Sequence, residues 1–251
     1  WQNRIAEVVA HWRDNFGFDG TRLDCIGWGQ TLNWANPDRA SDPIAYGGLQ
    51  LNKVIRDGFR EGAPHGITLP EGGKPLVFRN ADMLFDYPLY LAQRDITSEP
   101  DLARWIQQTR DWLQLECIGY PNDGLRGLVR FLQNHDVVEP SDFFGVGLSQ
   151  ALQAINTFIP GIPMIYQEQE TGFVDDLAQW MALRNAEACF RTGAADFLGV
   201  SASHDHVFAF LREADDGAAV VAVNLTGAPL TVDLSWPDAL SQRFPQAIDG
   251  F

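Results

Sequence analysis

The chain has 251 residues, of which 45% are hydrophobic and 20% are charged, a composition typical of a folded globular protein rather than a disordered one. Its formal net charge of -15 argues against nucleic acid or an anionic membrane surface as the partner, because both need a basic patch. The three cysteines, Cys25, Cys117 and Cys189, are too widely spaced for a disulfide framework or a zinc motif.

The first part of the chain alternates helical patterns with short apolar strands. The predicted elements are helices over residues 5–16 and 49–60, strands over residues 18–23, 67–69 and 81–87, and a polar loop over residues 27–48. Gly17 ends the first helix, because glycine readily takes the left-handed conformation that closes many helices.

The same alternation continues through the middle of the chain. Predicted helices cover residues 89–112 (in two pieces broken near Pro100), 144–158 and 175–189, and predicted strands cover residues 128–132 and 163–166. Strands that alternate with helices in this way predict βαβ units and a parallel sheet.

Beyond residue 193 the pattern changes to strands separated by turns. The predicted strands cover residues 206–211, 218–224 and 230–234, and no helix is predicted there. Sequential short strands with turn residues between them indicate a small antiparallel β domain.

These elements predict an α/β fold with two domains. Residues 1–192 form a partial (β/α)8 TIM barrel, about strands four to eight, and residues 193–251 form an antiparallel β domain that we expect to be incomplete. Five barrel strands are found, whereas a closed barrel of this type needs eight. The open sheet edges that result lead us to expect that the isolated chain is poorly folded or inactive.

Acidic residues lie where three of the predicted strands end: Asp24, Glu71 and Asp136. Because the carboxyl ends of parallel strands meet on one face of an α/β barrel, we expect these three carboxyl groups to converge. Several carboxyl groups in one cleft suit the cleavage of glycosidic bonds.

Arg22 and Asp24 lie two residues apart on one strand, so both side chains face the same side. A guanidinium beside a carboxylate lowers the pKa of the carboxylate, and an ionised carboxylate can serve as a nucleophile. A structural ion pair inside the barrel explains the same two residues, and the motif alone leaves both interpretations open.

Glu71 ends an apolar strand and precedes Gly72 and Gly73, which would let another molecule approach closely. A partly buried glutamate with a raised pKa can donate a proton to a leaving oxygen. The alternative is an ordinary solvated glutamate in a loop.

Asn134, His135 and Asp136 place an amide, an imidazole and a carboxylate at one strand end. These groups could bind the hydroxyls of a sugar ring, and the charge of Asp136 would favour an oxocarbenium-like transition state. A hydrogen-bonded network at the start of a loop explains the same residues without any ligand.

Other residues that could carry chemistry have simpler interpretations. Cys25 could be a thiol nucleophile, but a buried apolar cysteine is the expected state. His204 and His206 could ligate a metal, but surface histidines without further ligands are the default. Glu168 and Glu170 could line the rim of a cleft or lie in a solvated loop.

Four segments resemble motifs of the α-amylase family, the family 13 glycoside hydrolases, and they occur in that family's order. They are residues 18–24, residues 63–71, residues 131–136 and the Pro-Gly-Ile-Pro-Met-Ile-Tyr run over residues 160–166. The resemblance spans residues 1–172, and the trailing β segment lies where that family has its C-terminal β domain.

The resemblance implies a role for each of the residues named at the strand ends. The implied catalytic residues are Asp24 as nucleophile, Glu71 as general acid and base, and Asp136 as stabiliser of the transition state. Arg22, Asn134 and His135 match residues that hold the nucleophile and the substrate. The implied activity is that of a retaining glycoside hydrolase or transglycosylase that acts on α-glucosides or α-glucans by double displacement.

The implied partner is an oligosaccharide or a small glucoside, and the chemistry needs no cofactor. A structural calcium is possible in the longer protein, but no metal site is assigned to these residues. Linkage, substrate specificity and the choice between hydrolysis and transfer are not encoded in the motifs.

Two stretches depart from the family pattern. Residues 25–28 replace a Lys-His pair that often follows the nucleophile, and residues 137–139 lack an arginine that often follows the stabilising acid. The family's first three barrel strands and the domain inserted after the third are also absent. A non-catalytic carbohydrate-binding or scaffolding relative is therefore the second hypothesis.

The longest apolar run, residues 152–166, contains an asparagine, two prolines and a glycine and is therefore not predicted to span a membrane. No secretory signal is visible, yet the chain opens inside a helical pattern, so we expect the natural amino terminus to lie further upstream. The compartment and the oligomeric state are left undetermined.

Overall fold

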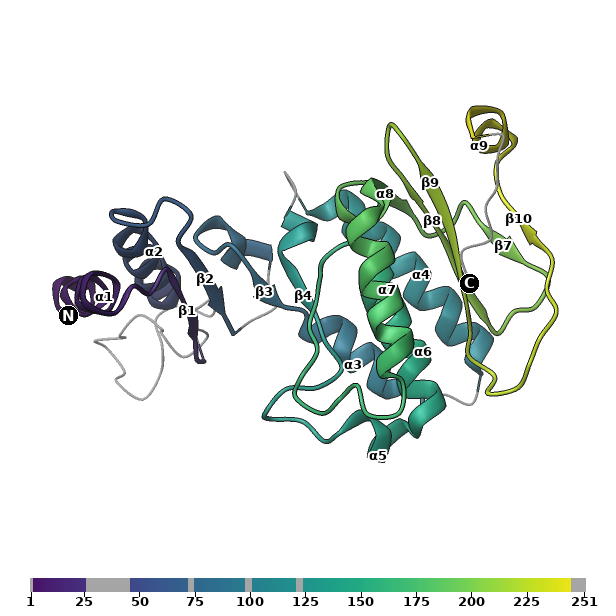
Figure 1. Ribbon diagram of the computed structural model, residues 1–251, viewed down its shortest axis with the longest axis horizontal. Helices are drawn as coiled ribbons and strands as arrows, with labels where there is room; N and C mark the ends of the chain where they lie inside the picture. Colours follow the sequence, from purple (N-terminus) through teal and green to yellow (C-terminus); the bar gives the residue numbers. More distant parts are fainter. Residues whose placement is uncertain (1, 26–45, 72–74, 98–100, 121–123, 245–251) are drawn as a thin grey trace, which may run out of the picture. The chain divides into compact units, whose positions relative to one another are not determined.

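The computed structural model of the chain describes residues 2–25, 46–71, 75–97, 101–120 and 124–244 (Figure 1). The chain divides into two compact units: the first comprises Trp1–Pro88 and Gly127–Val129, and the second comprises Leu89–Arg126 and Arg130–Phe251. Most of the loop predicted over residues 27–48, the glycines that follow Glu71 and the break near Pro100 lie outside the described residues.

The first unit consists of helices and parallel strands. Its elements are α1 (Gln2–Phe16), β1 (Gly20–Leu23), α2 (Tyr46–Arg60), β2 (Ile67–Pro70), a 3₁₀ helix (Pro75–Arg79), β3 (Leu84–Phe85) and the first part of β4 (Leu128–Arg130). Both β1–β2 and β3–β4 pair in parallel, and α1 and α2 lie side by side next to β1 and β2 (Figure 1). The predicted alternation of helices with parallel strands is confirmed here.

Two glycines shape the start of β1. Gly17 adopts a φ of 70°, and its N–H donates to the carbonyl of Arg13, so it ends α1 as predicted. At Gly20 a methyl group would lie 2.5 Å from the carbonyl oxygen of Ile67, so only glycine lets β1 approach β2 this closely.

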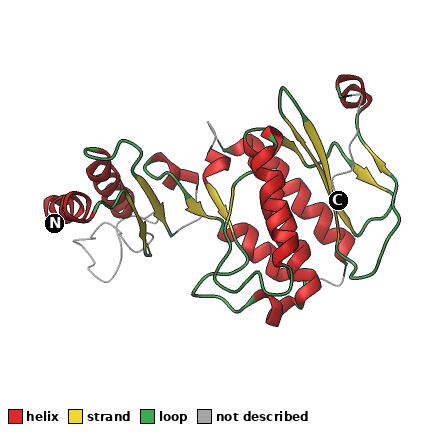
Figure 2. Cartoon of the chain, viewed as in Figure 1, coloured by secondary structure: helices red, strands yellow, loops and turns green. Residues whose placement is uncertain are grey.

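The second unit begins as a set of helices around a large apolar core (Figure 2). Its helices are the rest of α3 (Tyr87–Asp95), α4 (Leu102–Gly119), α5 (Pro140–Phe144), α6 (Val146–Phe158), α7 (Val174–Ala186) and α8 (Ala188–Arg191). The single helix predicted over residues 144–158 is wrong at its start: Gly145, with a φ of 77°, separates α5 from α6.

Antiparallel strands complete the second unit. They are β6 (Ala194–Asp196), β7 (Ser201–Ala202), β8 (Val207–Glu213), β9 (Ala218–Asn224) and β10 (Leu234–Ser235). One sheet has the order β6-β8-β9, and β7 pairs with β10. The predicted antiparallel arrangement is confirmed, whereas the expectation of no helix is wrong, because α9 (Asp238–Arg243) follows β10.

The expected α/β class is confirmed, with parallel strands first and antiparallel strands after them. Among the described residues the parallel strands do not close into a barrel, since β1–β2 forms a separate two-stranded sheet. The division into domains at residues 192 and 193 stays a prediction. None of the helices built from the described residues combines the length and the apolar character needed to cross a membrane.

Candidate functional site

The pairing of β1 with β2 brings two of the predicted acids together. Leu23 lies opposite Pro70 at the ends of these parallel strands, and Asp24 and Glu71 follow immediately. A carboxylate oxygen of each, together with the Cys25 thiol, lies within 4.8 Å of the others. The prediction that these acids lie at neighbouring strand ends is confirmed.

Asp82 fixes the strand that carries Glu71. Its carboxylate accepts a hydrogen bond from the backbone N–H of buried Thr68 in β2 at 2.9 Å. The same carboxylate pairs with Arg60 at 2.6 Å and with Arg56 at 3.1 Å, both on α2. Helix α2 and strand β2 are therefore tied together beneath the strand end, which leaves Glu71 little freedom to shift.

Arg22 binds both carboxylates of the strand-end pair. Its Nη1 contacts Asp24 Oδ1, and its Nη2 lies 3.2 Å from Glu71 Oε2. Partial burial acts to lower the pKa of Arg22, but the hydrogen bond to Asp24 and the charges of both acids raise it overall. One guanidinium thus allows two carboxylates to stay ionised at close range.

Glu71 accepts hydrogen bonds from two donors that the sequence analysis did not identify. The backbone N–H of Cys25 donates to its Oε2 at 2.9 Å, and the Tyr87 hydroxyl donates to its Oε1 at 3.0 Å. The hydrogen bond from the Cys25 amide is the largest of the effects that lower the pKa of Glu71. Burial opposes it, whereas the Tyr87 hydroxyl and the charge of Arg22 lower the pKa further. The expected rise of the Glu71 pKa is therefore wrong, because these donors outweigh desolvation.

Cys25 differs from its expected state. It is exposed rather than buried, and its φ of 45° places its backbone in the left-handed region that non-glycine residues rarely adopt. Desolvation and the neighbouring charges of Asp24 and Glu71 raise the pKa of its thiol. The thiol is thus poorly suited to act as a nucleophile, and the residue serves the site through its backbone amide.

The third predicted acid follows β4 in the second unit. Buried Arg130 anchors this strand by donating to the Pro160 carbonyl at 2.8 Å and pairing with Glu116 at 3.3 Å. The next residue, Phe131, stacks on Tyr90. These buried contacts therefore hold in place the start of the loop that carries the predicted site residues.

Asn134, His135 and Asp136 form a local network. The Asn134 side chain is buried and accepts the backbone N–H of Asp136 at 2.9 Å. His135 Nε2 lies 3.3 Å from Asp136 Oδ2, and both of these side chains are more than half exposed, at 55% and 52%. The structure thus groups Arg22, Asp24 and Glu71 in one unit and residues 134–136 in the other. The convergence of the two groups stays a prediction.

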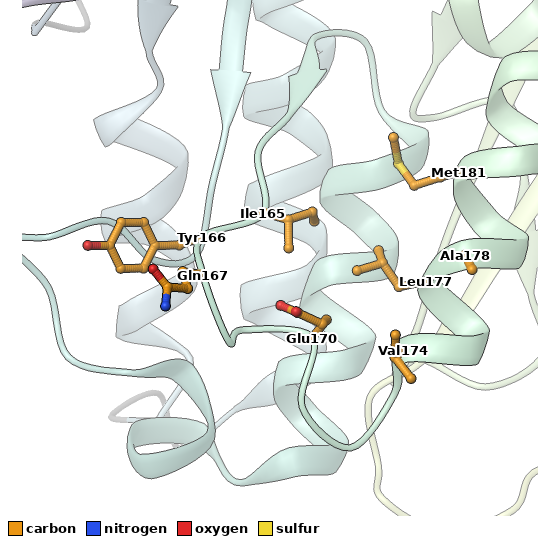
Figure 3. Close-up of a pocket in the computed structure, with 8 residues that line it drawn as sticks. All are labelled: Ile165, Tyr166, Gln167, Glu170, Val174, Leu177, Ala178 and Met181. Carbon is orange, nitrogen blue, oxygen red and sulfur yellow. The ribbon is translucent and has the colours of Figure 1, made fainter.

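A mainly apolar hollow of about 350 Å³ lies in the second unit between α7 and the segment after β5 (Ile162–Pro163) (Figure 3). The side chains of Ile165 and Leu177 lie beside that of Glu170 in this hollow. Glu170 is therefore placed at a depression of the surface, whereas Glu168 is exposed in a turn with a φ of 70°. The hollow is lined by few polar groups and lacks the paired acids of the strand-end site.

Two groups among the described side chains could hold a metal ion: Asp24, Cys25 and Glu71 in the first unit, and His204, Asp205 and His206 in the second. In the first group the guanidinium of Arg22 already contacts both carboxylates and offsets one of their two charges, so it would repel a cation placed between them. The structural calcium of the longer protein stays an expectation.

Comparison with known proteins gives a clear result for structure and none for sequence. No protein-family model matches the chain, and no curated protein matches it. A noncanonic maltogenic α-amylase from Thermotoga neapolitana aligns with a TM-score of 0.68 at 18% identity, covering 89% of this chain and 52% of that one. The chain shares the α-amylase fold.

Other solved structures support this assignment of the fold. The cyclic α-maltosyl-(1→6)-maltose hydrolase of Arthrobacter globiformis aligns with a TM-score of 0.69 at 17% identity, over 89% of this chain and 52% of that one. An α-amylase from Geobacillus thermoleovorans, complexed with acarbose, aligns with a TM-score of 0.64 at 18% identity, over 90% and 52%. The chain therefore spans about half the length of the solved chains it matches. The α-amylase resemblance that the sequence motifs predicted is confirmed for the fold.

Proposed function

We propose that the protein is a retaining glycoside hydrolase or transglycosylase that acts on α-glucosides or α-glucans by double displacement. The observation that carries this proposal is the pair of carboxylates, Asp24 and Glu71, with oxygens within 4.8 Å of each other. Retaining glycosidases hold their two carboxyl groups about 5–5.5 Å apart, whereas inverting ones need roughly 6.5–9.5 Å to admit a water molecule. The close spacing favours retention.

Asp24 is the nucleophile in this mechanism. Its carboxylate attacks the anomeric carbon and forms a glycosyl ester, while the leaving oxygen takes a proton from Glu71. Arg22 contacts Asp24 and favours the ionised carboxylate that the attack requires. The side chain of Asp24 is 70% exposed, so a sugar can reach it.

Glu71 acts first as an acid and then as a base. Its lowered pKa suits the second step, in which the carboxylate takes a proton from the water or sugar hydroxyl that attacks the glycosyl ester. For the first step Glu71 must carry a proton. We expect a bound sugar to cover this carboxylate, which is 19% exposed, and to raise its pKa by completing its desolvation.

The rest of the proposal concerns the larger assembly. Residues 1–192 are proposed to be about the last five strands of an eight-stranded barrel, with Asp136 stabilising the transition state and Asn134 and His135 binding sugar hydroxyls. One of the matched proteins was solved with two maltose-type ligands and another with acarbose. These ligands support an oligosaccharide as the substrate class.

The proposal is tested with the protein as its gene encodes it, using an aryl α-maltooligosaccharide as substrate. Asp24→Asn should abolish turnover, and Glu71→Gln should reduce it by roughly 10²–10⁴-fold, the usual contribution of general acid–base catalysis. Proton NMR of the first product should show the α-anomer. The β-anomer as first product, or undiminished turnover by Asp24→Asn, would remove this mechanism.

A non-catalytic carbohydrate-binding relative is the second candidate. The lowered pKa of Glu71 favours it, because a glutamate that stays ionised cannot protonate a leaving group. Calorimetry with maltoheptaose alongside the turnover assay separates the two functions. Binding without any turnover would favour the binding protein over the enzyme.

A further inference from the structure

We propose that His204, Asp205 and His206 form a binding site for a divalent transition-metal ion of the zinc type. These residues occupy the turn between β7 and β8, and one donor atom of each lies within 4.8 Å of the other two. The site is independent of the glycosidase proposal, because it involves none of the acids at the strand ends.

The distances suit a small ion. Asp205 Oδ1 lies 3.7 Å from Nδ1 of His204 and 3.8 Å from Nε2 of His206. A tetrahedral zinc ion bound at about 2.0–2.1 Å holds its ligand atoms roughly 3.3 Å apart. The carboxylate oxygen is therefore within a few tenths of an ångström of the spacing that an ion needs, and side-chain rotations can bring the imidazole nitrogens, which lie within 4.8 Å of each other, to that spacing.

One of the histidines already has the protonation state that a metal requires. The Nδ1 atom of His204 faces the backbone N–H of His206 at 3.1 Å and accepts a hydrogen bond from it. This nitrogen therefore carries a lone pair rather than a proton. A metal ion would take the place of that N–H on Nδ1, and the released N–H lies in a partly exposed turn, where water can reach it.

The backbone of the turn is fixed by its neighbours. The carbonyl of His204 accepts the N–H of Val207 at 3.2 Å, and the carbonyl of His206 accepts the N–H of Leu225 at 3.2 Å. Just before the turn, the N–H of Ser203 donates to the Asp233 carbonyl at 2.9 Å. The donor atoms are thus held close together before any ion arrives, which reduces the entropy lost on binding.

The chemistry of the donors selects the type of ion. Two imidazole nitrogens and one carboxylate oxygen suit Zn²⁺, Co²⁺, Ni²⁺ or Cu²⁺, whereas Ca²⁺ and Mg²⁺ prefer sites made of oxygen alone. The side chains of His204 and His206 are each 38% exposed, so an ion can enter without any opening of the fold. Three protein ligands leave at least one position open for water or another ligand.

The test is isothermal calorimetry of Zn²⁺ and, separately, of Ca²⁺ with chelator-treated protein. All variants carry Cys25→Ser, which removes the thiol from the other group that could bind zinc. The parent should bind one Zn²⁺ per chain and should not bind Ca²⁺ through these residues. The double variant His204→Gln/His206→Gln should lose the zinc, and the matched control His65→Gln, which alters an exposed histidine of the first unit, should keep it.

Equal zinc binding by the parent and the double variant, or no binding by the parent, would overturn the proposal. Imidazole ¹H–¹⁵N spectra of the unsubstituted chain give a second measurement that does not depend on the variants folding. Zinc should shift the signals of His204 and His206, and shifts confined to other histidines would contradict the site. Thermal stability is a poorer readout, because three ligands adjacent in sequence also bind zinc in the unfolded chain.

Discussion

Arg22, Tyr87 and the amide of Cys25 decide the charge of the strand-end site. Each of them donates to a carboxylate, and together they stabilise two negative charges within 4.8 Å of each other. The sequence predicted the contact of Arg22 with Asp24 from strand alternation alone. It could not predict the amide, because a backbone donor has no side-chain signature, nor Tyr87, which lies sixteen residues from Glu71.

Replacing Tyr87 tests how the donors act on Glu71. Tyr87→Phe removes one hydrogen bond to the carboxylate, so the pKa of Glu71 should rise toward the ordinary glutamate value of 4.5. Carboxyl ¹³C NMR titration of the labelled protein measures this change. Tyr166→Phe, which alters a tyrosine of the second unit, should leave the titration of Glu71 unchanged.

The same variant should also change how stability depends on pH. Because the pKa of Glu71 is lowered in the folded state, its charge stabilises the fold above the unfolded-state pKa of 4.5, and this contribution is lost as pH falls through the folded-state value. Tyr87→Phe should therefore lower the free energy of unfolding by about 1 kcal/mol at pH 7, with a smaller difference near pH 3. A difference that does not depend on pH would show that Tyr87 acts through packing alone.

The pairing of β1 with β2 is the element that brings the two acids together. Its register places Leu23 opposite Pro70, and this contact depends on a glycine at position 20. The sequence predicted both strands from their apolar residues and from the turn residues that flank them. It missed the separation of α5 from α6, because residues 144–158 fit a single helical pattern of apolar residues. That pattern does not show the positive φ of Gly145, which ends one helix before the other begins.

Gly20→Ala tests the importance of this pairing. The added methyl group would lie 2.5 Å from the Ile67 carbonyl oxygen, so the strands must separate, and we expect a loss of about 1–3 kcal/mol. Gly147→Ala is the control, because a methyl group there meets no atom within 4 Å. It should be neutral or stabilising, by at most about 1 kcal/mol. Urea unfolding measures the stability of both variants. Amide exchange in β1 and β2 then shows whether the pairing of these strands has weakened.

At the scale of the whole chain, the two compact units differ in how they bury apolar side chains. The core of the second unit contains fully buried residues from helices and from the antiparallel sheet, such as Leu152, Phe208 and Phe210. The first unit has a separate apolar cluster that contains Val9, Ile55 and Phe59, and none of the residues of its strand β1 is fully buried. The sequence predicted the order of parallel and antiparallel strands. It could not predict that Gly127–Val129, which are far from residues 1–88 in the sequence, pack with them in the first unit.

This difference predicts that the two units do not unfold together. Amides of β1 and β2 should exchange with deuterium faster than those of α6 and β8, because β1 has no fully buried residue, whereas α6 and β8 consist largely of buried residues. Thermal unfolding of these 251 residues should then depart from a two-state transition. Uniform protection in both units, with a single cooperative transition, would contradict this.

The left-handed backbone at Cys25 has a consequence for protein engineering. Since the main group that binds Glu71 at this position is the backbone amide, glycine at this position should keep that hydrogen bond. Glycine at this position would relieve about 1–2 kcal/mol of backbone strain. Cys25→Gly should thus raise the melting temperature of the chain while the amide at position 25 keeps its hydrogen bond to Glu71.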